Sequence, residues 1–203
     1  MKINSHFSVG LGLGYARANN YSEILIRYPL GDKLDSTAMV ENMVEAFPIR
    51  LSVFRNYHFS QTIGAYFVTG LEIYPTYYES SMMPAEPGNS HHQKANSIGF
   101  GLFYGAGLEI KVLSGLMIVL EGQGNYARIS QLKGVRESGG SSLPYEEKGT
   151  LYFSEISREI QPGITKIYGE LFIYEAKPSG DSVRRAAVDF SGFALSAGIR
   201  ISL

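Results

Sequence analysis

The chain has 203 residues, of which 44% are hydrophobic and 18% charged, and its formal net charge is −1. This balance suits one domain and leaves no basic surplus for holding nucleic acid. Cysteine is absent, which excludes disulfides and thiolate metal sites. No apolar run approaches the roughly 18 residues of a membrane-spanning helix, whereas a membrane-spanning strand needs only about 10 alternating residues.

The first predicted element covers residues 7–15, FSVGLGLGY. A basic start precedes it and Ala16-Arg17-Ala18 follows it, and this arrangement also outlines a secretory signal peptide with a cleavage site. Three glycines in it alternate with apolar residues, which is the two-residue period of a strand. The core of a signal peptide is helical, and each glycine would cost that helix about 1 kcal/mol. We therefore expect the first strand of the fold here.

Five later segments alternate in the same way, with apolar residues on one face of each. In the clearest of them, every second residue from Ile98 to Val112 is apolar, and the opposite face is mostly glycine. Alternation of this kind predicts half-buried antiparallel strands. The five predicted strands cover residues 47–57, 62–74, 97–112, 116–130 and 193–203.

Leu113, Ser114 and Gly115 form the predicted hairpin turn between two of these strands. A three-residue hairpin loop needs positive φ at its last position, which glycine adopts without strain. Such a loop pairs Val112 with Leu116 and keeps the apolar faces of both strands on the same side.

The faces opposite the apolar ones carry glycine and a few charges, where a water-exposed sheet would carry Lys, Glu, Thr and Ser. This composition indicates the crowded interior of a narrow barrel whose apolar face points outward. A soluble barrel is the alternative, but it would place the apolar face inside and expose the glycine-rich one. The inward charges are expected to pair with one another and to plug the lumen. They are Arg50, Glu72, Glu109, Glu121 and Arg200.

The register of the predicted hairpin places Glu109 and Glu121 near each other on adjacent strands. Two carboxylates side by side repel, so a positive group is expected between them. Arg50 and Arg200 are the expected counter-charges, because one planar guanidinium can bond two carboxylates.

The connections between strands alternate in length. Two are tight turns, at 57–61 and 113–115, whereas the others are long, polar and rich in Pro, Gly and Ser. Short connections on one rim and long ones on the other are typical of outer-membrane barrels. We expect external loops at about 17–46, 79–96 and 132–185, and the last of these contains a possible hairpin at 150–175.

Two stretches, FGLFYGAGLEIKVLSGLMIVLEGQGNYARI and AVDFSGFALSAGIRISL, resemble the bacterial outer-membrane β-barrel family, in particular uncharacterised members of the small eight-stranded OmpA/OmpX-like type. The resemblance implies an all-β, antiparallel, up-and-down transmembrane barrel, formed by residues 1–203 as a single domain in the outer membrane of a Gram-negative cell. Eight strands would comprise the six predicted ones and the hairpin at 150–175. The implied partners are outer-membrane lipid, lipopolysaccharide and, through the C-terminal strand, the barrel-assembly machinery, with no nucleic acid and an unspecified external partner.

Motifs that carry catalysis or bind cofactors are missing, including nucleophile elbows, phosphate loops and zinc-binding helices. The pair His91-His92 lacks neighbouring ligands at metal-binding spacing and is interpreted as part of a loop. His58 and Ser60 lie close in sequence, but no acidic residue stands near them to orient a catalytic histidine. The sequence therefore predicts no catalytic, cofactor or metal site, and no enzyme.

The predicted function is a structural or surface-interaction role in the outer membrane, with a lumen plugged by charge pairs. A narrow, porin-like channel for small or lipophilic solutes is the alternative. A lipid-modifying membrane enzyme is a lesser alternative.

Overall fold

A computed structural model describes residues 6–26, 36–84, 90–139, 145–161, 164–180 and 182–201. All regular elements in this part of the chain are strands of one antiparallel sheet, which confirms the all-β prediction. The thirteen strands are β1 (Phe7–Leu13), β2 (Ala16–Ile26), β3 (Ser36–Ala46), β4 (Ile49–His58), β5 (Ile63–Pro84), β6 (Ser90–Leu113), β7 (Leu116–Ser130), β8 (Lys133–Gly139), β9 (Tyr145–Gln161), β10 (Ile164–Tyr174), β11 (Val183–Arg185), β12 (Ala187–Asp189) and β13 (Gly192–Ile201).

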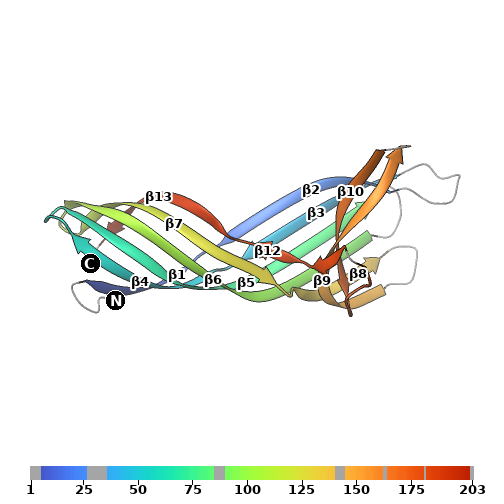
Figure 1. Cartoon of the computed structure of the whole chain (residues 1–203), viewed down its shortest axis with the longest axis horizontal. Helices are drawn as coiled ribbons and strands as arrows, with labels where there is room; N and C mark the ends of the chain where they lie inside the picture. The colour runs from blue at the N-terminus through green and yellow to red at the C-terminus, as the bar shows by residue number, and fades with distance from the viewer. Residues whose placement is uncertain are drawn as a thin grey trace.

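A long hairpin of β5 and β6 runs through the whole molecule (Figure 1). Its ladder continues without a register shift from Ile63 opposite Ile110 to Met82 opposite His91. With about 3.3 Å per residue, β5 is about 70 Å long. The other strands pair with one end of this hairpin or the other, which gives the molecule its elongated shape.

Two halves result from this pairing. The six-stranded half has the order β1-β4-β5-β6-β7-β13 and contains all six strands that the alternation predicts. The distal half consists of β2 and β3 beside β5, and of β8, β9 and β10 beside β6, with β11 on β9. The residues from 7 to 13 form the strand β1, as their alternating glycines predict.

Prolines mark the junction between the two halves. On β5, Ile73 is the last residue paired with β4 and Thr76 is the first paired with β3. Pro75 lies between them, and its carbonyl accepts a hydrogen bond from the Phe47 N–H at 3.0 Å. Because proline has no N–H to donate, it is tolerated where a strand changes partners. Pro48 occupies the same level, between β3 and β4.

The prediction of a closed eight-stranded barrel is wrong for this structure, because the sheet has thirteen strands and is open. Among the described residues, β1 pairs only with β4 and β13 only with β7. The two strands lie on opposite sides of the six-stranded half (Figure 1). The strand number differs because the segments 17–46, 79–96 and 132–185, expected to be loops, are mostly strands of the distal half. Residues 150–175 do form a hairpin, but β9 and β10 belong to that half and not to the six-stranded one.

The turn between β6 and β7 is shorter than predicted. Leu113 pairs with Leu116, so the loop is the two residues Ser114 and Gly115, and Gly115 adopts the positive φ of 87° expected of it. A register shift at Val112 adds the residue that the shorter loop lacks. From Lys111 opposite Met117 onward, β6 and β7 therefore pair as they would with a three-residue loop.

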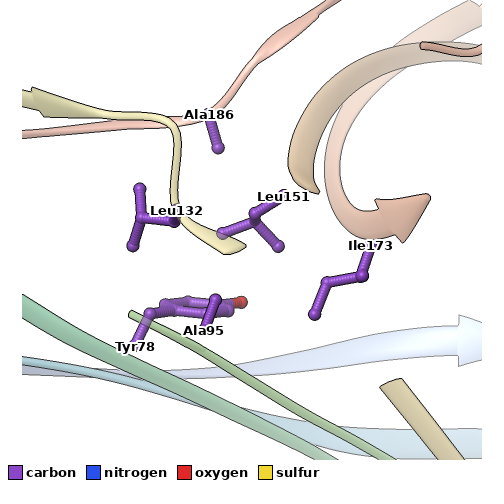
Figure 2. Packing of buried hydrophobic residues seen from close by; sticks show 6 residues of the cluster. All are labelled: Tyr78, Ala95, Leu132, Leu151, Ile173 and Ala186. Atoms are coloured by element: carbon purple, nitrogen blue, oxygen red, sulfur yellow. The ribbon is translucent and has the colours of Figure 1, made fainter. Parts of the chain in front are cut away.

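The inner face is the face of the sheet on which Tyr66, Glu72 and Tyr78 are buried, and the outer face is the opposite one. Three buried clusters follow one another along the inner face. The most distal cluster contains Tyr78, Ala95, Leu132, Leu151, Ile173 and Ala186. Figure 2 shows Tyr78 and Ala95 on one side of this cluster and Leu132, Leu151 and Ala186 on the other. Backbone bonds join this cluster at Leu151, which donates to Leu132 at 2.8 Å and accepts from Ala186 at 3.0 Å.

We expect Gly134→Ala to lower the free energy of unfolding by about 1–3 kcal/mol, which is the usual cost of overpacking. A Cβ at Gly134 would overlap the carbonyl oxygen of Lys94 and the Cα of Ala95, which are backbone atoms on the neighbouring strand. Gly198→Ala is the matched control, because a Cβ there meets no atom within 4 Å. Urea unfolding followed by circular dichroism measures both changes. Equal stability of the two variants would contradict the packing described for β6 and β8.

Candidate functional site

The outer face of the six-stranded half carries large apolar side chains on all six strands. Its large side chains are exposed although they are hydrophobic, which reverses the usual arrangement of a soluble sheet. They include Leu11, Leu51, Val53, Phe67, Leu71, Leu102, Leu108, Ile118, Leu120, Leu195 and Ile199. A contiguous exposed apolar surface of this extent is typical of a surface that contacts lipid or protein.

The inner face of the same half holds a buried ion pair between Arg50 on β4 and Glu72 on β5. The two residues are directly opposite in the ladder, and both Nε and Nη2 of Arg50 lie 2.7 Å from Oε1 of Glu72. The hydroxyl of Tyr74 donates to the other carboxylate oxygen at 2.6 Å. Glu72 is only 1% exposed, so these donors replace the water that the carboxylate loses.

Arg50 also connects strands that are not neighbours. Its Nη1 donates to Oε1 of Gln123 on β7 at 2.8 Å, although β5 and β6 lie between β4 and β7. Its guanidinium carbon lies 4.0 Å from the ring centroid of Phe103, which is also buried. These contacts require a strongly curled sheet with its inner face filled at this level.

The other three predicted charges lie nearer the turn between β6 and β7. Arg200 on β13 forms an ion pair with Glu109 on β6. Glu121 on β7 accepts a hydrogen bond from the hydroxyl of Tyr66 on β5, and the Arg200 guanidinium lies 5.2 Å from that ring. Glu109 and Glu121 therefore have separate partners, and no arginine bridges them.

The five residues expected to form one plug thus form two ion pairs and one tyrosine–carboxylate bond. Their burial differs: the Glu72 side chain is 2% exposed, whereas the Arg200 side chain is 40% exposed because β13 is an edge strand. Arg50 and Glu72 form the better protected pair. Arg200 is not the fully buried group that a closed lumen would have made it.

The two-residue period places Tyr66 and Gln123 on the inward face with the charges, but it does not predict that they bond to them. Tyr74, two residues beyond Glu72 on the same face, was missed and could have been identified by the same period. The ring of Tyr66 lies over Gly107, where a Cβ would overlap it. Glycine at this position leaves the space for a tyrosine that reaches from β5 to β7.

Ser60 and His92, two of the residues considered for chemistry, have structural partners. The Ser60 hydroxyl accepts hydrogen bonds from the N–H groups of Thr62 and Ile63 at 3.1 and 2.9 Å, which shapes the turn after His58. His92 lies 3.2 Å from Glu79 on the outer face. The described residues contain no group of three or more His, Asp or Glu side chains placed to hold a metal ion.

A second polar cluster lies on the inner face of the distal half. Three buried atoms there have no hydrogen-bond partner among the described residues: Nδ1 of His91, Oε1 of Gln93 and Nε of Arg136. Gln93 and Arg136 are directly opposite on β6 and β8. Burial, together with the positive charge of Arg136, lowers the pKa of His91.

We expect Arg50→Met to lower the free energy of unfolding by roughly 3–5 kcal/mol, because it leaves the buried Glu72 with Tyr74 as its remaining donor. Arg200→Met should cost less, because both members of its pair contact solvent. The double variant Arg50→Met/Glu72→Met should recover part of the loss. Urea unfolding of the four proteins measures these differences, and an equal cost of the two arginine changes would contradict the assigned difference in burial.

The lowered pKa of His91 predicts a pH dependence with a definite sign. The unfolded chain binds the proton more tightly than the folded one, so stability should fall as the pH drops below about 6.5, the ordinary histidine value. NMR titration of the imidazole should place the His91 pKa below that value. Arg136→Gln should raise it toward the ordinary value without restoring it fully, since burial remains. A His91 pKa above the ordinary value would contradict the environment described.

Comparison with known proteins gives this chain no relative from which a function could be inferred. No protein-family model, no curated protein and no solved structure matches the chain. Within the ranges that the structure describes, no helix is long and apolar enough to cross a membrane. The two faces of the sheet are therefore the features that bear on function.

Proposed function

We propose that the protein is an integral protein of the bacterial outer membrane with a structural or surface-interaction role. In this proposal the six-stranded half lies in lipid and the distal half projects into water. The single observation that carries it is the change in the outer face at the junction between the halves, from predominantly apolar side chains to charged and polar ones.

The outer face of the distal half is suited to water. Arg17 on β2 lies 3.6 Å from Glu45 on β3, and Glu79 on β5 lies 3.2 Å from His92 and 4.0 Å from Lys94 on β6. Such exposed pairs stabilise a fold little, but they are normal on a solvated surface. Within the six-stranded half, the same two strands β5 and β6 carry mainly apolar residues on this face. The polarity of the outer face therefore depends on the position along a strand and not on which strand it is.

The length of the apolar surface fits a bilayer. On β6 every outer residue from Ile98 to Val112 is apolar. These 15 residues extend about 46 Å along the strand, or roughly 32 Å across the membrane at the tilt of about 45° common for membrane strands. The hydrocarbon core of a bilayer is about 30 Å thick.

Aromatic residues at the junction support the same placement. The rings of Tyr15 and Phe47 are 5.2 Å apart, and both residues are exposed. The Tyr15 hydroxyl donates to Glu45 at 2.7 Å on the polar side. An aromatic ring with one apolar and one polar side is typical of the level at which lipid meets water.

The filled inner face favours a structural role over a conduit. Tyr66, Glu72 and Phe103 are each no more than 2% exposed, so they occupy the space at mid-height of the six-stranded half. A channel for small solutes would need that space, and conductance measured in planar bilayers separates the two functions.

A bilayer also sets a condition on the free edges. Unpaired backbone N–H and C=O groups cost several kcal/mol each in hydrocarbon. The proposal therefore requires the outward edges of β1 and β13 to be paired in the membrane with strands beyond those described.

We expect the protein to need detergent, and Leu108→Arg to destabilise it in lipid by about 2–4 kcal/mol. Ile118→Arg should cost less, because Ile118 is two residues from the start of β7 and so lies nearer the rim. Both side chains are exposed, at 48% and 44%, so an arginine there would be harmless in water. Met39→Arg is the control, because Met39 is exposed in the distal half. Unfolding in vesicles measures all three, and a wild-type protein that stays soluble and monomeric without detergent would overturn the proposal.

A further inference from the structure

A hollow of about 650 Å³ lies on the outer face of the six-stranded half. Its floor is formed by the small residues Thr69, Ala106, Gly122 and Gly124, and its walls include Phe67, Tyr104 and Phe193. Ala106 and Gly122 are directly opposite in the ladder, and Phe67 and Leu195 flank them in the same row. Small residues between large ones thus produce a depression in an otherwise continuous apolar surface.

One charged side chain lines this hollow, that of Arg55 on β4. Its guanidinium carbon lies 5.3 Å from the ring centroid of Tyr57 and 5.9 Å from that of Phe7. In the part of the chain that the structure describes, no carboxylate lies within ion-pair distance of Arg55. A cation on an apolar outer face is costly in lipid unless an anion accompanies it.

The hollow extends away from the rim that carries the short turns. Arg55 is three residues from the end of β4 at His58, about 10 Å along the strand. Ala106 is seven residues from the end of β6 at Leu113, about 23 Å along that strand. The cation therefore lies near the rim and the apolar floor near the middle of the sheet.

This order, a cation near the rim followed by the apolar floor of the hollow, complements one class of molecule. A glycerophospholipid carries its phosphate at the membrane surface and its acyl chains toward the middle. A guanidinium bonds a phosphate through two parallel N–H groups, and its aliphatic stem lies along apolar surface.

We propose that the hollow binds one glycerophospholipid, with the phosphate on Arg55 and an acyl chain over Ala106 and Gly122. The inference rests on the proposed placement of the six-stranded half in lipid. Charge complementarity at Arg55 favours this site, because Arg55 is the charged residue among those that line the hollow.

The test is native mass spectrometry of the full chain released from detergent, titrated with dimyristoyl phosphatidylglycerol. We expect one lipid to bind before any others. Arg55→Gln should weaken this first binding at least tenfold by removing the phosphate partner, and Ala106→Phe should weaken it similarly by filling the hollow. Arg128→Gln and Ala197→Phe are the matched controls, because both residues are exposed outside the hollow, and they should bind as the wild type does.

Two results would overturn the lipid site. One is equal binding by the wild type and Arg55→Gln, and the other is equally tight binding of dimyristoylglycerol, which lacks the phosphate. Fractionation of the same variants from expressing cells keeps this outcome separate from the proposed function. Variants that stay in the membrane fraction but bind phosphatidylglycerol as the wild type does refute the site alone, whereas a wild-type protein in the soluble fraction refutes membrane placement itself.

Discussion

The uninterrupted ladder between β5 and β6 is the constraint on which the rest of the structure depends. Because side chains alternate strictly along a strand, a ladder without a bulge keeps the same residues on the same face from one end to the other. On β5 this face holds Tyr66 at one end and Ser80 at the other, and both are buried. The inner face is therefore continuous through both halves, and the difference in environment between them is confined to the outer face.

Hydrogen bonds between polar side chains on the inner face of the six-stranded half help to determine how strongly its sheet curls. Arg50 is bonded both to its neighbour Glu72 and to Gln123 three strands away, and the Tyr66 hydroxyl reaches Glu121 two strands away. Bonds of this reach form only when the sheet is curled, so they favour one curvature over flatter ones. A buried ion pair contributes little net stability, whereas its geometry is specific. We regard the network chiefly as a determinant of shape.

Much of the six-stranded half could be predicted from the sequence, because its two faces differ sharply in polarity. The distal half could not be predicted in this way. In β3, for example, Val40 and Asn42 share the inner face while Met43 and Glu45 share the outer one, so neither face has a consistent polarity. Pro75 also suggests that a strand ends where β5 in fact only changes partners.

The candidate site shows the same boundary between what alternation determines and what it does not. The two-residue period places Arg50, Glu72, Glu109 and Glu121 on one face without any structure. It does not determine which of them meet, because partners two or three strands apart depend on strand order and curvature. Glu121 illustrates this, since its partner is the uncharged Tyr66 and not an arginine.

The two backbone hydrogen bonds of Leu151, to Leu132 and to Ala186, have a consequence for the order in which the chain folds. Strands β12 and β13 both pair with β7, yet β8 to β11 intervene in the chain, and closing so long a loop carries an entropic cost that slows folding. Leu132 and Ala186 stand at the two ends of that insertion, and both hydrogen-bond to Leu151. Once β8 and β9 have formed, these bonds hold the ends of the insertion together and shorten the effective loop. The distal half thereby becomes a template for the last strand, and the edge of the six-stranded half is completed only after the insertion has folded.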